Sequence, residues 1–486
     1  MEFEFPVLAV ARIARPAALA VVVLLSGCGG GGSETLRPKA GEFDPAFGSN
    51  GIATLEGAPF AGARASARFA VADPATGTIR AAGNVSLSSV HAHLLPGGQP
   101  ETAFAGTGFI LLPAVPANLP FSTGRNGIAA LARPDGSEVL VESVHVPCVT
   151  GNQCALTGGG YWSTAARAVS ATGEAVPGYG PSGEAVLSPI DPAQALAEPS
   201  GSVLVLGRAS AGLAGVRRNA LARLALQGLP DEAFKANAAA SIDCPGLIPQ
   251  SSLGAVMARH ADGKLLLAQS FATGGTPDVA VCVSRLLPDG TLDPSHGTGG
   301  RVMLPWPFQW NRATPVALFA LPGGGAALFL QIRRELNGNY HYHYMIATMT
   351  ADGSLDASRF DGGVDGPTDL HVAKLAAVAR QSDGKYLIAG YPALGDDPSA
   401  PPGSDRIDLS QPRIGRLHVA SGADLSFGTL GTGYTPLLSF GRRLAPSHVS
   451  VGPDGGILVA GASGAAGPVN AGEATRFAVA KLAGDP

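Results

Sequence analysis

The sequence predicts an all-β fold, a seven-bladed β-propeller whose blades are four-stranded antiparallel sheets. Three observations lead to this expectation: short apolar runs joined by tight turns, a repeat of this pattern every ~60 residues, and an order of motifs that brings both chain ends into one blade. Only 14% of the residues are charged, while glycine and proline number 67 and 39. This composition is typical of many short strands and turns.

The repeat unit is clearest between Ala255 and Pro305. Strands are expected at 255–259, 264–269, 279–287 and 301–304. Asp262-Gly263 and Asp289-Gly290 stand between apolar runs, and Asp-Gly is a strong hairpin signal because glycine adopts positive φ without a Cβ clash. The run Leu265–Leu267 fits a strand that is buried on both faces. One such sheet is not stable alone and has to bury its faces against neighbouring copies.

Copies of this unit occupy the whole chain after residue 40. The first turn ends at a glycine in seven copies: Gly77, Gly136, Gly201, Gly263, Gly324, Gly384 and Gly455. A second motif, of the type Leu-Asp-x-x-Phe-Gly, follows the third strand at 41–52, 99–110, 229–242, 290–302, 353–364 and 422–434. Residues 170–186 keep the turn but lack the core of this motif, so the sequence does not predict whether that blade has an outer strand.

The order of the two motifs distinguishes a closed ring from an open solenoid. The chain presents the second motif at residue 41, before any first turn, and ends at Lys481–Pro486, where the second motif of the last copy is due. The N-terminal strand is therefore expected to complete the seventh blade, which removes free sheet edges. An open solenoid needs capping ends, and the sequence offers none.

The pattern of Asp-Gly-Lys, an apolar run and a later Leu-Asp-x-x-Phe-Gly resembles the bacterial delta-60 repeat family across residues 41–486. This resemblance implies a propeller-like architecture. It implies no particular activity.

The N-terminus predicts a secreted, lipid-anchored protein. Arg12 and Arg15 precede the apolar run Pro16–Leu25, which is short for a membrane span, and Leu25-Ser26-Gly27-Cys28 resembles a bacterial lipoprotein cleavage site. The expected organisation is a signal peptide at 1–27, a lipidated Cys28 with a flexible tether at 28–40, and the propeller at 41–486. A plain signal peptide that happens to contain a cysteine is the alternative.

The expected location is the bacterial cell envelope, attached to a membrane through the acyl chains on Cys28. Gly29, rather than aspartate, follows the cysteine, and similarity to lipoprotein sorting rules favours the outer membrane. The net charge of −4 and the lack of a basic stripe predict no nucleic-acid partner.

The remaining cysteines number four, an even count that suits disulfides in an oxidising compartment. Cys148 and Cys154 flank one long loop and are expected to pair with each other, which leaves Cys244 to pair with Cys282. Metal ligation is the alternative, but no Cys-x-x-Cys spacing supports it.

Aromatic residues suggest a binding site. Trp306, Phe308 and Trp310 join the fourth and fifth copies, and the next loop contributes Tyr340, His341 and His343. Together they could form a platform for a sugar, a peptide or another flat ligand. The competing interpretation is that the two tryptophans fill the border between blades as ordinary core. His341 and His343 could also bind a metal, but no carboxylate partner is evident.

Other chemistry-bearing residues have structural explanations. His91 and His93 share one face of an expected third strand and are interpreted as packing or solvent-facing. The turn aspartates suit hydrogen bonds to their own turns; they are Asp135, Asp262, Asp289, Asp352, Asp383 and Asp454. The expected innermost strands are rich in alanine, and nucleophile, metalloprotease and dinucleotide motifs in proper context are absent.

The sequence therefore favours a membrane-anchored envelope lipoprotein that acts as a non-enzymatic binding or scaffolding propeller for a protein or glycan, without a cofactor. One alternative is an envelope hydrolase or lyase with a site at the mouth of the channel. Another is a subunit of an envelope assembly.

Overall fold

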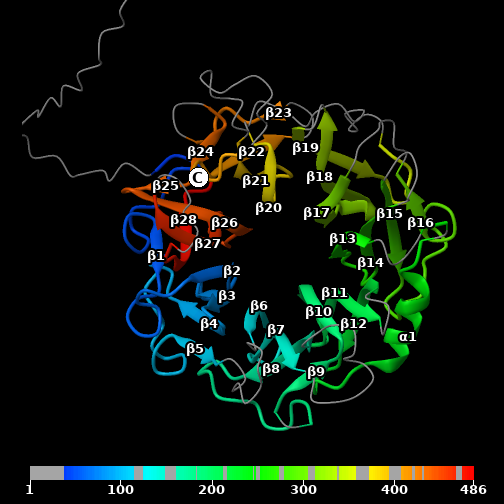
Figure 1. Cartoon of the computed structure of the whole chain (residues 1–486), viewed down its shortest axis with the longest axis horizontal. Helices are drawn as coiled ribbons and strands as arrows, with labels where there is room; N and C mark the ends of the chain where they lie inside the picture. Colours follow the sequence, from blue (N-terminus) through cyan, green and yellow to red (C-terminus); the bar gives the residue numbers. More distant parts are fainter. Residues whose placement is uncertain are drawn as a thin grey trace, which may run out of the picture. The chain divides into compact units, whose positions relative to one another are not determined.

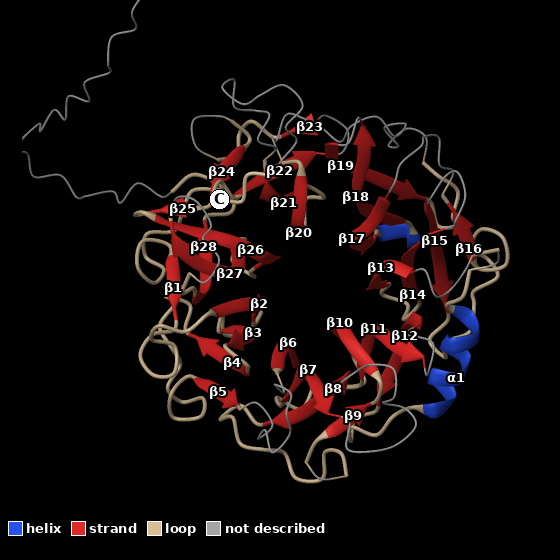
Figure 2. Cartoon of the chain, viewed as in Figure 1, coloured by secondary structure: helices blue, strands red, loops and turns tan. Residues whose placement is uncertain are grey.

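Seven β-sheets follow one another around a common axis, and the expected seven-bladed β-propeller is confirmed (Figures 1 and 2). Each sheet is antiparallel, and the strand that precedes the first turn of each blade lies nearest the axis. The computed structural model describes residues 38–113, 124–147, 160–181, 183–211, 216–244, 246–247, 252–272, 279–304, 312–336, 339–356, 372–392, 407–418, 422–428, 432–466 and 473–485.

Blades 1 to 3 come from the first half of the chain. Blade 1 comprises β2 (Ala65–Ala72), β3 (Ile79–Val85), β4 (Ser88–Leu94) and β5 (Phe109–Leu112). Blade 2 comprises β6 (Arg125–Ala132), β7 (Glu138–Pro147), β8 (Gly160–Val169) and β9 (Ala185–Leu187), so the copy with the incomplete motif does form an outer strand. Blade 3 comprises β10 (Ile190–Ala197), β11 (Val203–Ala211) and β12 (Val216–Leu224).

Blades 4 to 6 continue in the same way. Blade 4 comprises β13 (Ser252–Arg259), β14 (Leu265–Ala272), β15 (Val279–Leu286) and β16 (Arg301–Met303), close to the strands expected from the repeat unit. Blade 5 comprises β17 (Arg312–Ala320), the short 3₁₀ turn η2 (Pro322–Gly324), β18 (Ala326–Leu336) and β19 (Asn339–Met349). Blade 6 comprises β20 (Lys374–Arg380), β21 (Tyr386–Tyr391), β22 (Arg413–His418), β23 (Gly422–Ala423) and β24 (Tyr434–Pro436).

Both ends of the chain build blade 7. Its strands β25 (Leu438–Ser439), β26 (Arg442–Val451), β27 (Ile457–Ala465) and β28 (Arg476–Leu482) come from the C-terminal part. Strand β1 (Ile52–Thr54) is the outer strand, and it pairs antiparallel with β28 from Ile52↔Ala480 to Thr54↔Ala478. The predicted closure by the N-terminal strand is confirmed.

Blade 3 differs from the expectation of strands alone. Helix α1 (Glu232–Ser241) follows β12, where the second motif was expected to lead into a strand. Asp231 caps this helix, since its side chain accepts a hydrogen bond from the backbone N–H of Phe234 at 3.0 Å. Phe234 and Ala238 are buried on one side of the helix. A capped alanine-rich segment with one apolar side therefore replaces the strand.

Each innermost strand carries a β-bulge. The register of the first strand shifts against the second in all seven blades, for example between Ala67 and Phe69 and between Leu375 and Ala377. A bulge bends the strand and increases its twist, which suits a strand that curves around the axis. The alanines expected on these strands lie on β6, β10, β17 and β20.

An aromatic side chain of one blade docks on a glycine of the next blade. Phe427 of blade 6 is fully buried, and a β-carbon added at Gly41 would lie 2.7 Å from its ring. Gly41 also has a φ of 87°, so only glycine fits this position without strain. The same contact joins five further pairs: Phe47 with Gly98, Phe104 with Gly173, Tyr179 with Gly228, Phe234 with Gly290, and His296 with Gly353.

We call these six pairs the aromatic–glycine contacts. The glycine ends the third turn of its blade, or occupies the equivalent place at the N-terminal entry. The aromatic residue belongs to the second motif of the preceding blade or, for Tyr179, to the segment 170–186 that lacks the core of that motif. Backbone hydrogen bonds accompany five of them, for example from Gly428 N to Ala40 O at 2.9 Å and from Gly48 N to Gly97 O at 2.8 Å. The repeated motif therefore encodes how one blade binds the next.

Replacing Phe427 with alanine should destabilise the protein by about 3–5 kcal/mol, because it empties a buried ring site at the border where the chain closes. Leu425→Ala is the matched control, two residues away in the same motif but 62% exposed, and should change stability by less than about 0.5 kcal/mol. Chemical denaturation of both variants measures this difference. Equal effects of the two substitutions would contradict a structural role for the aromatic–glycine contact.

Candidate functional site

The two ends of the ring differ in their loops. One end, here called the turn end, carries the first and third turns of each blade. Six first turns have the same length, at 133–137, 198–202, 260–264, 321–325, 381–385 and 452–456. The other end, here called the connection end, carries the links between second and third strands, which range from Ser86–Leu87 in blade 1 to 392–412 in blade 6. Variable loops on a regular scaffold are where binding usually occurs.

The aromatic platform is predicted from the sequence for the connection end. Trp306, Phe308 and Trp310 lie outside the described residues. Tyr340, His341 and His343 lie on β19, where their backbones pair with Glu335, Arg334 and Ile332 of β18. Their side chains are outside what the structure describes, so the platform stays a prediction.

Trp162 is the tryptophan that the structure describes, and it packs at the connection end of blade 2. It pairs across the strands with His145, whose ring lies edge-on to the indole at 5.2 Å. A β-carbon added at Gly124 would lie 3.5 Å from Cη2 of Trp162 and 3.8 Å from Cδ2 of Leu87. These contacts give Trp162 a packing role at the end of the β7–β8 hairpin.

The turn aspartates make the hydrogen bonds expected from turn chemistry. Each accepts a bond from the backbone N–H two residues later, for example Asp135 from Ser137 at 3.0 Å and Asp289 from Thr291 at 2.9 Å. Asp262, Asp352, Asp383 and Asp454 do the same. The structural interpretation of all six residues is confirmed.

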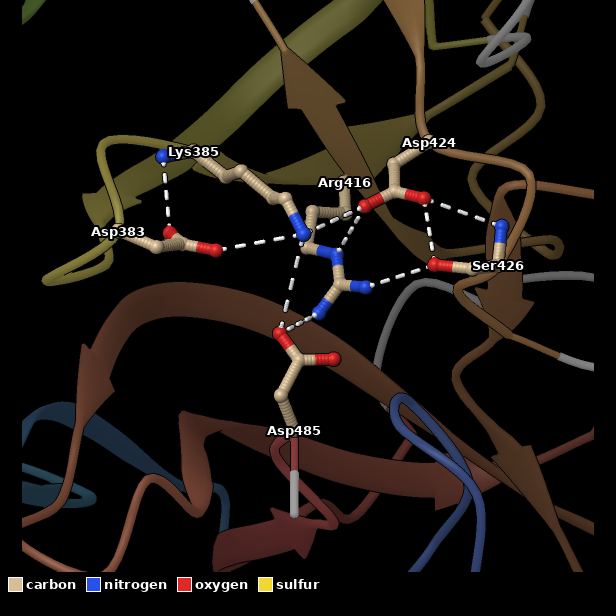
Figure 3. A network of polar contacts seen from close by, with 6 residues as sticks. All are labelled: Asp383, Lys385, Arg416, Asp424, Ser426 and Asp485. Atoms are coloured by element: carbon tan, nitrogen blue, oxygen red, sulfur yellow. Dashed lines mark hydrogen bonds and ion pairs between the residues drawn. The ribbon is translucent and has the colours of Figure 1, made fainter.

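A charged network, not evident from the sequence, lies at the turn end of blades 6 and 7 (Figure 3). Arg416 on β22 is fully buried and donates to Asp424 at 2.9 Å and to Asp485 at 2.6 Å. Lys385 lies 3.1 Å from Asp424, and Ser426 accepts a hydrogen bond from Arg416 at 3.1 Å. The guanidinium also lies 4.9 Å from the ring of Phe427, the docked aromatic residue of this border.

This network repeats in other blades with the same roles. In blade 4, Arg285 donates to Asp293 at 2.8 Å and to the carbonyl of Ala351 in the third turn of blade 5. In blade 3, Arg223 donates to Pro288 O of blade 4 at 2.7 Å. Asp485, near the C-terminus, occupies the equivalent place for Arg416. In blades 3, 4 and 6, this arginine therefore binds its blade to the next blade.

The same network determines how Asp424 ionises. Burial of the carboxyl opposes ionisation, but hydrogen bonds from Ser426 and Lys385 and the charge of Arg416 outweigh it. They hold the pKa of Asp424 well below its usual range. The carboxylate stays ionised at neutral pH and is committed to the ion pair, which makes it unsuitable as a proton donor or acceptor.

A buried polar cluster lies between blades 1 and 2. Glu142 on β7 is fully buried and accepts hydrogen bonds from Ser89 on β4 and from Arg125, the latter at 2.7 Å. His91 on β4 is 1% exposed, and its Nε2 lies 3.7 Å from Glu142. The residue types match a nucleophilic triad, but the serine hydroxyl donates to the glutamate rather than to the histidine. No substrate reaches groups so deeply buried, so the cluster joins blades.

His93 continues this polar border toward the turn end. Its Nε2 lies 3.0 Å from Oε1 of Glu138 in blade 2, and its Nδ1 lies 3.3 Å from Glu101. Its ring stacks on Phe104 with the centroids 3.7 Å apart. His91 and His93 were expected to pack or to face solvent. The structure buries both of them against glutamates of the neighbouring blade.

The cysteines are described in part. Cys244, which follows α1, forms a disulfide with Cys282 on β15, so the predicted pairing of these two residues is confirmed. The bond joins the helical segment of blade 3 to blade 4. Cys28, Cys148 and Cys154 lie outside the described residues, and their predicted roles stay predictions.

Two further properties concern only the residues that the structure describes. Within them, no group of three or more His, Cys, Asp or Glu side chains is placed to hold a metal ion. No helix in these ranges has both the length and the apolar character needed to cross a bilayer.

Comparison with known families supports propeller-type repeats. The family model described as "Domain of unknown function (DUF5122) beta-propeller" matches residues 198–234 and 260–295. These segments contain the first turns of blades 3 and 4 and the beginnings of the second motifs that follow them. No curated protein matches the sequence.

Solved structures with similar architecture have unrelated descriptions. An α-L-arabinanase of Penicillium chrysogenum complexed with arabinobiose is 12% identical with a TM-score of 0.37, covering 73% of this chain and 91% of that chain. An α-L-arabinofuranosidase of Fusarium graminearum with arabinobiose is 9% identical with a TM-score of 0.35 over the same shares. Drosophila Plexin A in complex with Semaphorin 1b is 9% identical with a TM-score of 0.41, covering 91% and 88%. Such similarities carry no information about ligand or activity.

Replacing His296 with phenylalanine should reduce the acid sensitivity of the protein. His296 is 1% exposed and occupies the docked aromatic position, where four blades have Phe47, Phe104, Phe234 and Phe427. Burial and the charge of Arg285 lower the pKa of His296 below its ordinary value of 6.5. As the pH falls below 6.5, the unfolded chain binds a proton that the folded protein resists, so stability is lost.

The measurement is the free energy of unfolding at pH 7 and pH 5. The wild type should lose more stability between these values than His296→Phe does. Leu425→Ala changes an exposed residue without a titratable group and serves as the control, which should show the pH dependence of the wild type. An unchanged pH dependence in His296→Phe would show that this buried histidine does not contribute to it.

Proposed function

We propose that this protein is a lipid-anchored, non-enzymatic binding or scaffolding propeller of the bacterial cell envelope. Its partner is a protein or a glycan, and the binding surface is the connection end of the ring. The acyl chains on Cys28 attach the protein to the membrane, with the outer membrane favoured by Gly29. The tether at 28–40 links this anchor to the propeller.

The contrast between the two ends of the ring is the observation that carries this proposal. At the turn end, six of the seven first turns have the same length, and aspartates and cations pair with one another and with the neighbouring blade. Those groups hold the ring together and are already committed. At the connection end, lengths vary from blade to blade, while the antiparallel order of the first three strands is the same in every blade. A regular scaffold with variable loops at one end suits recognition of a partner.

Lipid attachment is tested by expressing the full chain in bacteria supplied with an alkyne analogue of palmitate. The wild type should become labelled and sediment with the membranes, while Cys28→Ser should remain unlabelled. Cys148→Ser is the matched control, since it removes another cysteine and should still be labelled. Labelling that persists in Cys28→Ser, or that is missing from the wild type, would contradict an anchor at this residue.

Partner binding is tested with glycan and peptide arrays probed with the mature protein. The wild type should bind a defined set of ligands, and Trp306→Ala combined with Trp310→Ala should weaken that binding at least tenfold, because stacked aromatic contacts are removed. Trp162→Ala serves as the control, since Trp162 packs against Gly124 and His145. Equal loss in the control would argue against a platform at Trp306 and Trp310.

A further inference from the structure

The inner strands of the ring are basic, although the chain as a whole has a net charge of −4. The first strands of the seven blades, β2, β6, β10, β13, β17, β20 and β26, surround the axis (Figure 2). Their sequences contain eight arginines and lysines and one acidic residue, Asp191. The carboxylate of Asp191 accepts a hydrogen bond from Ser143 at 2.7 Å. Positive charge is therefore concentrated around the axis.

Residues in the middle of these strands reach solvent. Arg68, Ala193 and Ser447 are exposed, although each lies inside its strand at the β-bulge. The faces of these strands pack in the cores shared with neighbouring blades, and one edge of each pairs with the second strand of its blade. The exposed side is therefore the edge that faces the axis, and the inner strands line a channel that is open to water.

Arg68 is the charged residue at the level of the bulges. The bulge residue of the other six blades is apolar or a serine: Ile128, Ala193, Leu253, Val316, Ala376 and Ser447. Within the described residues, the guanidinium of Arg68 has neither a hydrogen bond nor an ion pair. A guanidinium offers five N–H donors in a planar fork and no acceptor. Arg68 therefore suits a ligand with negatively charged oxygens.

Two further arginines lie at the turn end of the channel. Arg259 is the last residue of β13 and Arg380 is the last residue of β20, on either side of blade 5. A β-carbon added at Gly263 or Gly384 would lie 3.7 Å from Nη2 of the arginine of the same blade, so both side chains lie along their own first turns. Their Nε atoms are buried without a hydrogen-bond partner, and neither guanidinium has an ion pair among the described residues.

The aspartates of the first turns do not neutralise these arginines, because each has another cation as its partner. The pairs, at 2.7–3.7 Å, are Asp73 with Arg80, Asp135 with Arg133, Asp262 with Lys264, Asp383 with Lys385 and Asp454 with Lys481.

The other inner-strand cations whose side chains are described begin their strands at the connection end, and they have partners in their own blades. Arg125 pairs with Glu142 and Arg443 with Glu473. Arg442 donates to Ser463 at 2.9 Å, and Nζ of Lys374 lies 5.9 Å from the centre of the Tyr391 ring. Arg68, Arg259 and Arg380 are therefore the cations of the inner strands that remain available to a ligand.

The positions of these three arginines suggest different roles. Arg68 lies four residues before the end of β2, which is about 13 Å from the turn end at about 3.3 Å per residue. Positive groups at the mouth of a cleft with apolar walls raise the local concentration of anions and speed their entry. Arg259 and Arg380 are placed for this attraction, and Arg68 is placed to bind the anion that enters.

We propose that the central channel is an anion-binding site, in which Arg68 holds a carboxylate or phosphate group of a small ligand and Arg259 and Arg380 attract this ligand at the turn end. The site lies apart from the connection end, where the proposed function places the partner, and it does not depend on the lipid anchor. The ring then has two binding regions, its variable loops and its channel.

The test is calorimetric titration of the full-length protein in nonionic detergent at low salt, with citrate and inorganic pyrophosphate as probes. The wild type should bind one or both probes, and Arg68→Gln should weaken binding at least about tenfold, because a charge-assisted hydrogen bond is lost. Arg259→Gln combined with Arg380→Gln should weaken it about two- to fivefold, because the attraction at the mouth is removed. Binding of citrate indicates a carboxylate ligand, and binding of pyrophosphate indicates a phosphate ester.

Arg218→Gln is the matched control, since Arg218 is exposed on β12, the third strand of blade 3, away from the axis. This variant should bind the probes as the wild type does. Two results overturn the proposal: neither probe binds the wild type, or Arg68→Gln and Arg218→Gln bind with equal affinity. Equal affinity would show that anions respond to the overall charge of the surface and not to the channel.

A second measurement tests the channel without relying on a ligand. Ala193→Cys places a thiol on the inner wall, and Val186→Cys places one on the outer strand β9, where Val186 is 52% exposed. After subtraction of the wild-type signal, the thiol at 193 should react faster with an anionic methanethiosulfonate than with a cationic one. The ratio of the two rates should exceed that at 186 at least about tenfold at low salt, and should fall with added salt or with Arg68→Gln. Equal ratios at 193 and 186 would contradict a positive channel.

Discussion

An aromatic ring docked on a left-handed glycine is the interaction on which the rest of this structure depends. Each blade buries both faces only against neighbours, so its stability depends on how firmly the next blade is held. The ring of Phe427 fills the space that a side chain at Gly41 would need, and five further pairs repeat this contact. Glycine at the end of a turn is therefore a packing requirement as well as a conformational one.

The charged side chains at the turn end follow from the same contact. Arg416 and Arg223 lie over the docked rings of Phe427 and Phe234, and both reach across to the next blade. A buried cation of this kind needs a complete set of acceptors, because an unpaired charge in the interior is costly. The repeated aspartate supplies one acceptor from the same blade, and the following blade supplies the other. The motif therefore combines a turn, a ring contact and an ion pair.

The closing blade uses the same elements from opposite ends of the chain. Gly41 receives Phe427, Asp485 receives Arg416, and β1 pairs with β28. The contacts that join two blades elsewhere here join the N-terminus to the C-terminus. The ring is therefore closed by the same contacts that join neighbouring blades elsewhere.

The features that could be predicted from the sequence are those that depend on residues close together in the chain. Asp-Gly turns, apolar runs and a period near 60 residues gave the number of blades, and the order of the motifs gave the closure. Helix α1 was missed because its segment was matched to the second motif, although Asp231 followed by an alanine-rich stretch is a capping pattern. The expectation that every repeat consists of strands led to this helix being overlooked.

Contacts between blades were beyond sequence reasoning. His91 and His93 alternate on β4, and Glu138 and Glu142 share one face of β7, but only the ring brings the two strands together. The platform at Trp306 and Trp310 stays a prediction from the sequence.

The central claim is that the closed ring behaves as one cooperative unit held by its borders. Native-state hydrogen exchange on the folded protein tests this claim most directly, with peptides that cover β1, β28, β14 and β27. If the account is right, the amides of β1 and β28 exchange with the same free energy of opening as those of β14 in blade 4. Exchange of β1 and β28 well before β14 would contradict it, since the closing blade would then open independently of the ring.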